Sequence, residues 1–366
     1  MQISKLGLRN FRNHENLDLS FTPGATTIVG RNGRGKTNIV EAVHYLATLG
    51  SHRVSQDAPL IRSGQSAATI WASVEKHNRQ AQVELTINYP GLNKVVLNTI
   101  PLSKPRDILG LVTTVIFSPE DLDLVKGEPS ARRRFIDELS TSLIPKFSNT
   151  RSDFERTLKQ RNTLLKSLGR RNPSPQARAT LDAWSEQLIQ HGSEIIFTRL
   201  ENIKRIEPQV SEFGKTISGD TEPLNLSYSN GWLPAETTSK NEIAKMFETE
   251  LETRSKDEVD RGTTLVGPHR DDVNIQISSL PAKGYASHGQ SWSIAIALRL
   301  AAFKTLREHD DDPILILDDV FAELDENRRN RLVSIIADVE QTLITAAVIE
   351  DIPKGLPSVQ LLLEDN

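Results

Sequence analysis

Hydrophobic and polar residues alternate along much of the N-terminal third of the chain, a pattern that predicts β-strands. A short β-branched segment, 25–29, follows the turn pair Pro23-Gly24, and after it Ile39, Val43 and Leu46 recur at helical spacing until Gly50. We therefore expect a β-rich layer beside one strand–helix unit. The alternating segments are 3–8, 17–21, 69–75, 82–88 and 94–97.

The middle of the chain has the apolar spacing of long helices. Residues 145–205 predict two antiparallel helices joined by a basic, proline-containing loop at 169–175, and 242–260 predicts a charged helix. Strand patterns return at 265–277, 314–317 and 343–348. We expect an α/β fold in which 1–120 and 261–366 form one discontinuous domain. Residues 121–260 would then be an inserted helical lobe with a short antiparallel arm.

The clearest chemical pattern lies between the first buried strand and the first helix. Gly30 to Thr37 reads Gly-Arg-Asn-Gly-Arg-Gly-Lys-Thr and matches the phosphate-binding loop G-x-x-x-x-G-K-[ST]. The whole segment (Gly30, Arg31, Asn32, Gly33, Arg34, Gly35, Lys36 and Thr37) would curl its N–H groups around phosphates. Lys36 would reach the β- and γ-phosphates, and Thr37 would ligate Mg²⁺. Arg12 and Asn13 either form a plain polar turn between strands or lie over the nucleotide.

Three later segments suit a nucleotide site. Asp318 and Asp319 end the buried strand 314–317. Beside a phosphate loop, the first carboxylate is expected to hold Mg²⁺ and the second to orient the attacking water. Ser287, Gly289 and Gln290 precede a helical pattern and predict a second anion site, which one nucleotide would not need from the same chain. The third segment is the turn Glu323-Leu324-Asp325, before an Arg-rich helix.

Composition and charge narrow the class of protein. The chain has 366 residues, 37% hydrophobic and 25% charged, and contains no cysteine. Disulfides and thiolate-bound metals are therefore excluded. No apolar run approaches the roughly 20 residues of a membrane span, and the N-terminus has no signal pattern, so we expect a cytoplasmic protein without a membrane partner.

The charge is unevenly distributed. The net charge is -4, yet residues 126–205 hold 16 Lys and Arg against 9 Asp and Glu. A basic helical region on an acidic body suggests a surface for a polyanion. For any one arginine of the run 132–134, a solvated helix surface is the simpler explanation. The candidate contacts are Arg132, Arg133, Arg134, Arg170 and Arg171.

Together, the motifs at 30–37, 287–290, 318–319 and 323–325 resemble those of the ABC-type ATPases. The helical insertion between the phosphate loop and the other motifs is similar to that of the structural-maintenance-of-chromosomes branch, and the resemblance covers essentially the whole chain. It implies a P-loop ABC-type ATPase head, with a mixed sheet core and an antiparallel β layer, that uses ATP and Mg²⁺. Many such ATPases carry a histidine after the strand that corresponds to 343–348, and this segment of the chain contains no histidine.

The resemblance also implies a mechanism. ATP would close two copies of the chain head to tail, so that Ser287, Gly289 and Gln290 of one copy cap the nucleotide held by Lys36 of the other. Glu323 and Asp325 would form the segment called the D-loop. The dimer would clamp single- and double-stranded DNA at gaps and junctions, act in recombinational repair and replication, and help partner proteins to load a recombinase.

Lys36 and Asp319 are the expected catalytic residues. Because aspartate is one methylene shorter than glutamate, we expect slow hydrolysis. Two other classes share some of these motifs: the ATPase subunit of a membrane transporter and a small-molecule kinase. A transporter subunit would have a much shorter insertion, and a kinase would leave the 287–290 and 318–319 motifs without a purpose.

Overall fold

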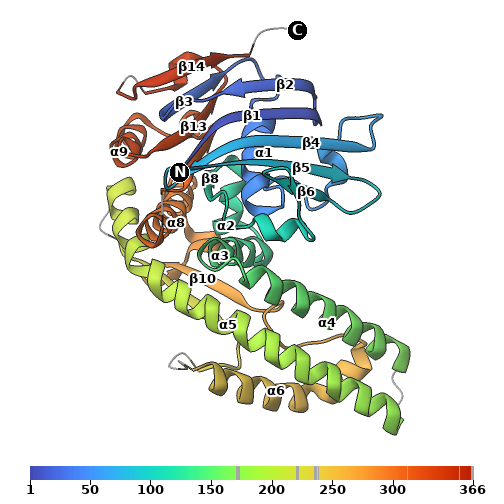
Figure 1. The fold of residues 1–366 in the computed structure, drawn as a ribbon. Helices are drawn as coiled ribbons and strands as arrows, with labels where there is room; N and C mark the ends of the chain where they lie inside the picture. Colours follow the sequence, from blue (N-terminus) through green and yellow to red (C-terminus); the bar gives the residue numbers. More distant parts are fainter. Residues whose placement is uncertain are drawn as a thin grey trace.

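Two sheets of different kinds, one antiparallel and one parallel, lie at one end of the molecule, and long helices extend from them (Figure 1). The computed structural model describes residues 1–169, 174–219, 222–234, 237, 239–310, 312–353 and 355–363. We call the two sheets with α1, α8 and α9 the head. We call α4, the first half of α5 and α6 the arm.

The antiparallel sheet has the strand order β2-β1-β4-β5-β6-β7. Its buried face alternates as the sequence predicts: in β4, Ala68, Ile70, Ala72 and Val74 are buried and the residues between them are more exposed. The five segments predicted as strands are all confirmed. The strands are β1 (Gln2–Phe11), β2 (His14–Ser20), β4 (Ala67–Lys76), β5 (Arg79–Asn88), β6 (Lys94–Leu97) and β7 (Ile100–Pro101).

The second sheet is parallel, with the order β14-β3-β13-β12-β8, so the two strand directions are segregated into separate sheets. Helix α1 (Lys36–Thr48) packs between the sheets, since one hydrophobic cluster joins its Ile39 and Val43 to Leu8 of β1 and Ile316 of β12. The parallel strands are β3 (Gly24–Val29), β8 (Thr114–Phe117), β12 (Ile314–Asp318), β13 (Gln341–Ala346) and β14 (Ser358–Leu362).

Short 3-10 helices occur in connections of the described chain, before β4, before and after β8, and after β12 and β13. They are η1 (Ala58–Leu60), η2 (Pro105–Ile108), η3 (Pro119–Asp121), η4 (Val320–Glu323) and η5 (Ile349–Asp351). A small third sheet has the order β11-β10-β9. Its strands are β9 (Leu224–Ser229), β10 (Asp272–Ile277) and β11 (Leu280–Pro281), so the predicted strand 265–277 begins only at Asp272.

Helix α5 (Pro175–Ser218) is longer than the sequence pattern predicts and runs from the arm into the head (Figure 1). Its first half packs with α4 (Phe147–Leu168) and α6 (Lys240–Arg261) in a cluster that includes Phe154 and Ile196. Its second half, with Ile206 and Val210, shares the core of the head. The other helices are α2 (Leu122–Lys126), α3 (Pro129–Leu143), α7 (Ala282–Tyr285), α8 (His288–His309) and α9 (Glu326–Ile336). The proposed domain boundaries stay a prediction.

Buried ion pairs connect the arm to the segment 262–272. Arg161 of α4 donates to Glu258 of α6 at 2.6 Å and to Thr264 at 2.7 Å, and both charged side chains are almost fully buried. Arg199 of α5 is held in the same way by Asp137 of α3 and donates to the Pro268 carbonyl. These contacts attach the connection between α6 and β10 to α4 and α5.

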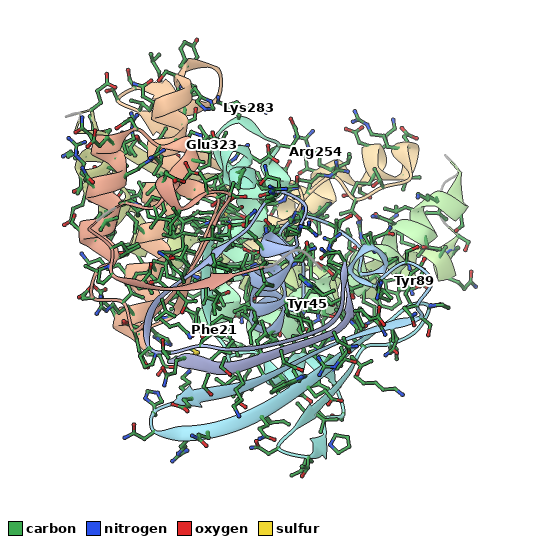
Figure 2. The ribbon with its side chains drawn as sticks, turned by 90° about the horizontal axis from the view of Figure 1, so that it is seen from above. Phe21, Tyr45, Tyr89, Arg254, Lys283 and Glu323 are labelled. Carbon is green, nitrogen blue, oxygen red and sulfur yellow. The ribbon has the colours of Figure 1, made fainter. Side chains whose placement is uncertain are left out.

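Seen from above, the labelled Phe21 lies beside the antiparallel sheet and Tyr45 lies on α1, whereas Glu323 and Lys283 lie toward the opposite side of the molecule (Figure 2). In the parts of the chain that the structure describes, none of the helices has both the length and the apolar character needed to cross a bilayer.

Replacing Glu258 by glutamine should lower the free energy of unfolding by about 3 kcal/mol, because it leaves the Arg161 charge buried without its partner. Glu250→Gln on the same helix is the matched control, since its partner Arg254 is exposed and such pairs contribute little. Chemical denaturation of both variants checks this. Equal losses in the two variants would contradict the assigned role of the buried pair.

Candidate nucleotide site

The parallel sheet brings the predicted nucleotide residues to one edge. Asp318 at the end of β12 lies opposite Thr345 of β13, and Ala346 of β13 lies opposite Val29 of β3. Because the strands are parallel, the segments that leave their carboxyl ends meet at the same place. The phosphate loop and the two aspartates therefore share one site. Thr37 and Asp318, which are hydrogen-bonded there, are 281 residues apart in the chain.

The phosphate loop has the expected strand–loop–helix context, between β3 and α1. Lys36 is 4% exposed, and its Nζ donates to the Gly30 carbonyl at 2.8 Å and lies 3.4 Å from the Arg31 carbonyl. The ammonium group is thus placed over the loop, where phosphate oxygens would meet it. Gly35 has φ 92°, and a Cβ there would lie 2.5 Å from the Asn13 side chain, so only glycine fits.

The turn at 12–14 lies against the phosphate loop. Asn13 Nδ2 donates to the Gly33 carbonyl at 3.4 Å, and the Asn13 side-chain oxygen accepts from Asn38 of α1 at 2.7 Å. His14 Nε2 lies 3.1 Å from the Gly35 carbonyl, so the tautomer that donates from Nε2 makes this bond. Burial lowers the pKa of His14. His14 was not among the predicted site residues.

Arg12 has a structural partner in the first helix. Its guanidinium donates to both carboxylate oxygens of Glu41, at 2.9 and 2.6 Å, and to the Pro59 carbonyl at 3.1 Å. Glu41 is fully buried and also accepts from Ser51. A bidentate pair of this kind fixes the turn on α1. Contact of Arg12 with nucleotide stays a prediction, and Glu41 is a residue that sequence reasoning missed.

Asp318 is buried, and two hydroxyl groups donate to the same oxygen of its carboxylate. Thr37 Oγ1 lies 3.0 Å from Asp318 Oδ1, and Thr345 Oγ1 lies 2.6 Å from it. Burial, with a smaller contribution from the neighbouring Asp319 charge, raises the pKa of Asp318 to about 6. A divalent cation here would favour the charged form.

A hydroxyl and one carboxylate suit Mg²⁺, which usually takes its other ligands from phosphate and water. Among the described residues, no group of three or more His, Asp or Glu could hold a metal by itself. Thr37 and Asp318 are therefore the protein groups that could hold the ion beside a bound phosphate.

Thr345 is the second residue that the sequence did not reveal. Besides its bond to Asp318, its hydroxyl accepts from the Asp319 backbone N–H at 2.9 Å. Asp319 has φ 53°, a left-handed conformation that is uncommon for aspartate and recurs at functional sites. Thr345 therefore positions both aspartates, in a strand that has no histidine.

The predicted signature residues lie at the start of α8. The hydroxyl of Ser287 accepts from the Gln290 N–H at 3.2 Å, and the Gln290 side chain accepts from the Ser287 N–H at 2.9 Å. This capping box begins the helix and leaves Ser287 exposed. In the described part of the chain, the hydrogen bonds of 287–290 go to α8 itself and to Glu222, not to the phosphate loop.

The predicted D-loop residues follow β12 directly. Glu323 ends η4 and is exposed. Asp325 caps α9, because its side chain accepts from the Arg328 N–H at 3.0 Å. Both residues are thus outside the hydrophobic core and on the same connection as Asp319.

The structure corrects one of the predicted DNA contacts. Arg132 is 7% exposed and its guanidinium is bound by both oxygens of Asp272, at 2.8 and 2.9 Å. An arginine buried in this way is a structural ion pair and has no face left for a polyanion. Arg133 is partly buried and donates to the Asp271 carbonyl, whereas Arg134 is exposed. Arg170 and Arg171 lie outside the described residues.

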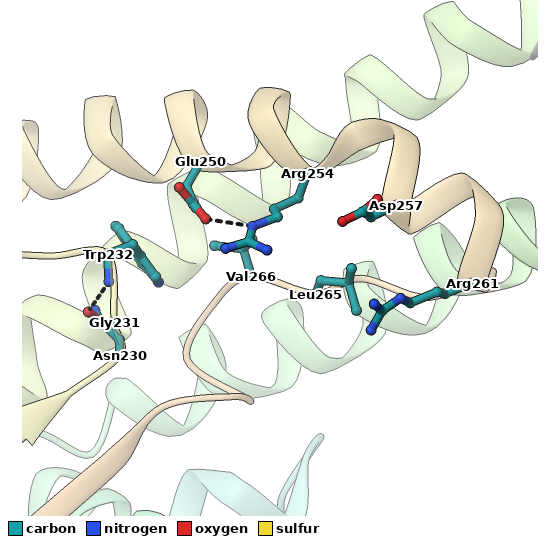
Figure 3. Close-up of a pocket in the computed structure, with 9 residues that line it drawn as sticks. All are labelled: Asn230, Gly231, Trp232, Glu250, Arg254, Asp257, Arg261, Leu265 and Val266. Carbon is teal, nitrogen blue, oxygen red and sulfur yellow. Dashed lines mark hydrogen bonds and ion pairs between the residues drawn. The ribbon is translucent and has the colours of Figure 1, made fainter.

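A hollow of about 310 Å³ opens on the arm, away from these motifs, between α6 and the segment that leads to β10 (Figure 3). Trp232 forms one end of it and stacks on Phe247, with ring centroids 5.5 Å apart. Arg254 at the rim is already paired with Glu250. None of the predicted site residues lines this hollow.

Thr345→Val should reduce the turnover of ATP with Mg²⁺ by about 10-fold or more, because valine keeps the shape but loses both bonds to the aspartates. Thr345→Ser keeps the hydroxyl and should retain most of the activity. Steady-state hydrolysis, measured with nucleotide affinity, checks this. A valine variant as active as the serine variant would contradict the positioning role.

Comparison with known proteins agrees with this arrangement. Residues 2–353 match the family described as the RecF/RecN/SMC N terminal domain. The DNA replication and repair protein RecF of Streptomyces avermitilis is 46% identical over 100% of this chain and 99% of its own length. RecF of Frankia alni is 45% identical over 99% of this chain and 98% of its own.

Solved structures give the same result at the level of the fold. The recombination mediator protein RecF with ATP, of the RecFOR pathway, superposes with a TM-score of 0.89 at 29% identity, over 96% of this chain and 93% of its own. The Smc head domain of Pyrococcus furiosus, at 17% identity and a TM-score of 0.53 over 94% and 89%, shares the fold alone. The expected ATPase-head fold with an antiparallel β layer is confirmed, but the pairings of its core sheet are parallel and not mixed as expected. This chain belongs to the RecF family.

Proposed function

We propose that this protein is an ATP-dependent DNA clamp of recombinational repair and of replication-fork recovery. Two copies associate head to tail when each holds ATP, and slow hydrolysis that requires Mg²⁺ releases them. The dimer binds DNA at gaps and at junctions between single and double strands, within the cytoplasm. It works with RecO and RecR to load RecA.

The observation that carries the proposal is the separation of two half-sites. Lys36, Thr37, Asp318 and Asp319 lie at one sheet edge, whereas the α8 N-terminus presents an exposed Ser287 whose bonds do not reach that edge. A helix N-terminus attracts anions through its free N–H groups and its dipole. Supplied by a second copy, this terminus would close over the γ-phosphate held by Lys36.

The proposed chemistry follows from the site. Mg²⁺, held by Thr37 and Asp318, would neutralise charge on the β- and γ-phosphates. Asp319 would orient the attacking water, and its left-handed backbone, fixed by Thr345, sets the direction of the carboxylate. Because the aspartate side chain is short, we expect slow turnover, which suits a nucleotide that acts as a latch.

The known relatives support the biological role. Curated relatives are called DNA replication and repair proteins, and the similar solved structures are described as a recombination mediator with ATP in the RecFOR pathway. Membership of the RecF family argues against the ATPase subunit of a membrane transporter, which was the alternative interpretation of the motifs.

A basic stripe on α4 is the best candidate for the DNA surface. Arg156, Lys159 and Lys166 are exposed and spaced by three and seven residues, which places them on one side of the helix. Helix α4 carries five basic and two acidic residues, whereas α6, on the other side of the arm, carries five basic and seven acidic. Arg134 is the remaining exposed candidate on α3. Arg170 and Arg171, which follow α4 in the sequence, stay candidates as predicted.

ATP with Mg²⁺ should convert the wild-type chain from monomer to dimer, as measured by mass in solution. Lys36→Ala should prevent this conversion because it removes the charge that holds the phosphates. Asp319→Asn should preserve it while reducing turnover at least about 100-fold, since water is no longer oriented. Gapped duplex DNA should increase the dimer fraction of wild type and of Asp319→Asn.

Two results would contradict the proposal at different points. A wild-type chain that stays monomeric with ATP, Mg²⁺ and gapped DNA would remove the clamp mechanism. An Asp319→Asn variant that turns over ATP at the wild-type rate would leave the clamp intact but reassign the carboxylate that orients water.

Charge reversal on α4 should weaken DNA binding more than the same change on α6. Replacing Arg156, Lys159 and Lys166 by glutamate should lower affinity by about 10-fold or more at moderate salt and reduce the salt dependence of binding, because phosphate contacts are lost. The matched control replaces Lys245, Arg254 and Lys256, which are exposed on α6.

The measurement is DNA affinity against salt concentration for both triple variants, with ATP present. Equal effects of the two triple variants would mean that net charge, not the α4 stripe, governs binding. Loss of binding in the α6 variant alone would move the DNA surface to the opposite side of the arm.

A further inference from the structure

Arg328 connects two motifs of this chain that are far apart in sequence. It lies in the first turn of α9, three residues after Asp325, and its Nη1 donates back to the Asp325 carboxylate. Its Nε donates to Ser293 Oγ of α8 at 3.0 Å. Ser293 in turn donates to the Gly289 carbonyl at 3.1 Å. A continuous path of hydrogen bonds therefore runs from the D-loop to the turn 287–290, which we call the signature turn.

The guanidinium also lies directly against Gly289. A Cβ at this position would be 3.2 Å from both terminal nitrogens of Arg328 and 3.5 Å from its central carbon. Because both terminal nitrogens are nearer than the central carbon, the edge of the guanidinium that carries Nη1 and Nη2 is directed at the glycine. A side chain at 289 would press on the end of Arg328 and shift it by a few tenths of an ångström, so the position of the guanidinium and the glycine are coupled.

Arg328 is not what holds α9 in place. Leu332 and Ile336 of this helix are buried in the core of the head, and Arg331 donates to the Ile217 carbonyl at the end of α5 at 2.9 Å. The Arg328 side chain is 22% exposed, so its charge stays close to the surface that Ser287 and Asp325 share. The hydrogen bonds of Arg328 reach the D-loop and Ser293 next to the signature turn, whereas other residues hold α9 in place.

We infer that Arg328 is a positioning residue of the composite nucleotide site. It locks the signature turn to the D-loop of the same chain, so that both meet the nucleotide of the other copy as one rigid surface, with a cation beneath Gly289. This inference rests on the proposed ATP-dependent dimer. It predicts that the effect of Arg328 is exerted on the partner's phosphate loop and not on its own.

Mixing two impaired variants tests this directly. A Lys36→Ala chain lacks a working phosphate loop but has an intact signature turn, and an Arg328→Ala chain has the reverse. In a mixed dimer, the phosphate loop of the Arg328→Ala chain faces the intact signature turn of the Lys36→Ala chain. One complete site is thus restored, and the other site carries both defects.

We expect Arg328→Ala alone to lose about 10-fold or more in ATP-dependent association and turnover, because a charge-assisted hydrogen-bond set is removed. As a monomer, the Arg328→Ala chain should bind a fluorescent ATP analogue with an affinity within about twofold of that of wild type, because a mutation distant from a binding site acts nearly independently of it. Mixed dimers, isolated through a tag on one chain only, should recover about half of the wild-type turnover per dimer, since one of two separate sites works.

The controls separate positioning from folding. Arg331→Ala removes another α9 arginine that anchors the same helix but does not touch the signature turn, and it should leave association and turnover close to wild type. Ser293→Ala breaks the path from the α8 side and should reproduce a weaker form of the Arg328→Ala defect, with the same rescue by the Lys36→Ala chain.

The outcomes are distinguishable. If wild type does not associate with ATP, the proposed function fails and this inference fails with it. If wild type associates but the mixed dimers stay inactive, Arg328 acts within its own chain and only the inference is overturned. An Arg328→Ala variant with wild-type association and turnover would overturn it as well, as would an equal loss in Arg331→Ala.

Discussion

The hydrogen bond between Thr37 and Asp318 is the contact on which the nucleotide site depends, because it joins the phosphate loop to the strand that ends in two carboxylates. It exists only because β3, β13 and β12 are parallel neighbours whose carboxyl ends coincide. Thr345, from the strand between them, completes the arrangement by bonding both aspartates. The buried sheet thus sets the relative positions of groups that would otherwise be far apart.

A second constraint is electrostatic and connects the head to the arm. Arg161 with Glu258, and Arg199 with Asp137, are buried pairs whose extra donors and acceptors are satisfied by Thr264 and by the Pro268 carbonyl. Such pairs contribute specificity of arrangement when every partner is present. Helix α5 contributes the first half of its length to the arm cluster and the second half, which contains Pro208, to the core of the head.

The arginine runs show where sequence reasoning fails. Arg132 to Arg134 are adjacent and chemically alike, yet one is buried on Asp272, one donates to a backbone carbonyl and one is exposed. Their partners lie about 140 residues later in the chain, and no local pattern reveals such a pairing. The same limit hid Glu41, His14, Thr345 and Arg328, each of which acts through a residue that is distant in sequence.

The sequence by itself determined the kind of chemistry and the class of fold. The spacing of Gly30 to Thr37 predicts a phosphate loop, because the groups that contact a phosphate all come from one short segment. The pair Asp318-Asp319 predicts its acidic partner. Alternation with period two likewise predicted the antiparallel strands, since it follows from the pleat. Only the tertiary structure decided which strands are neighbours, which arginines are buried, and that the signature turn faces outward while Arg328 ties it to the D-loop. These features depend on packing between distant segments, and their energies come from burial and from partners that the linear order does not show.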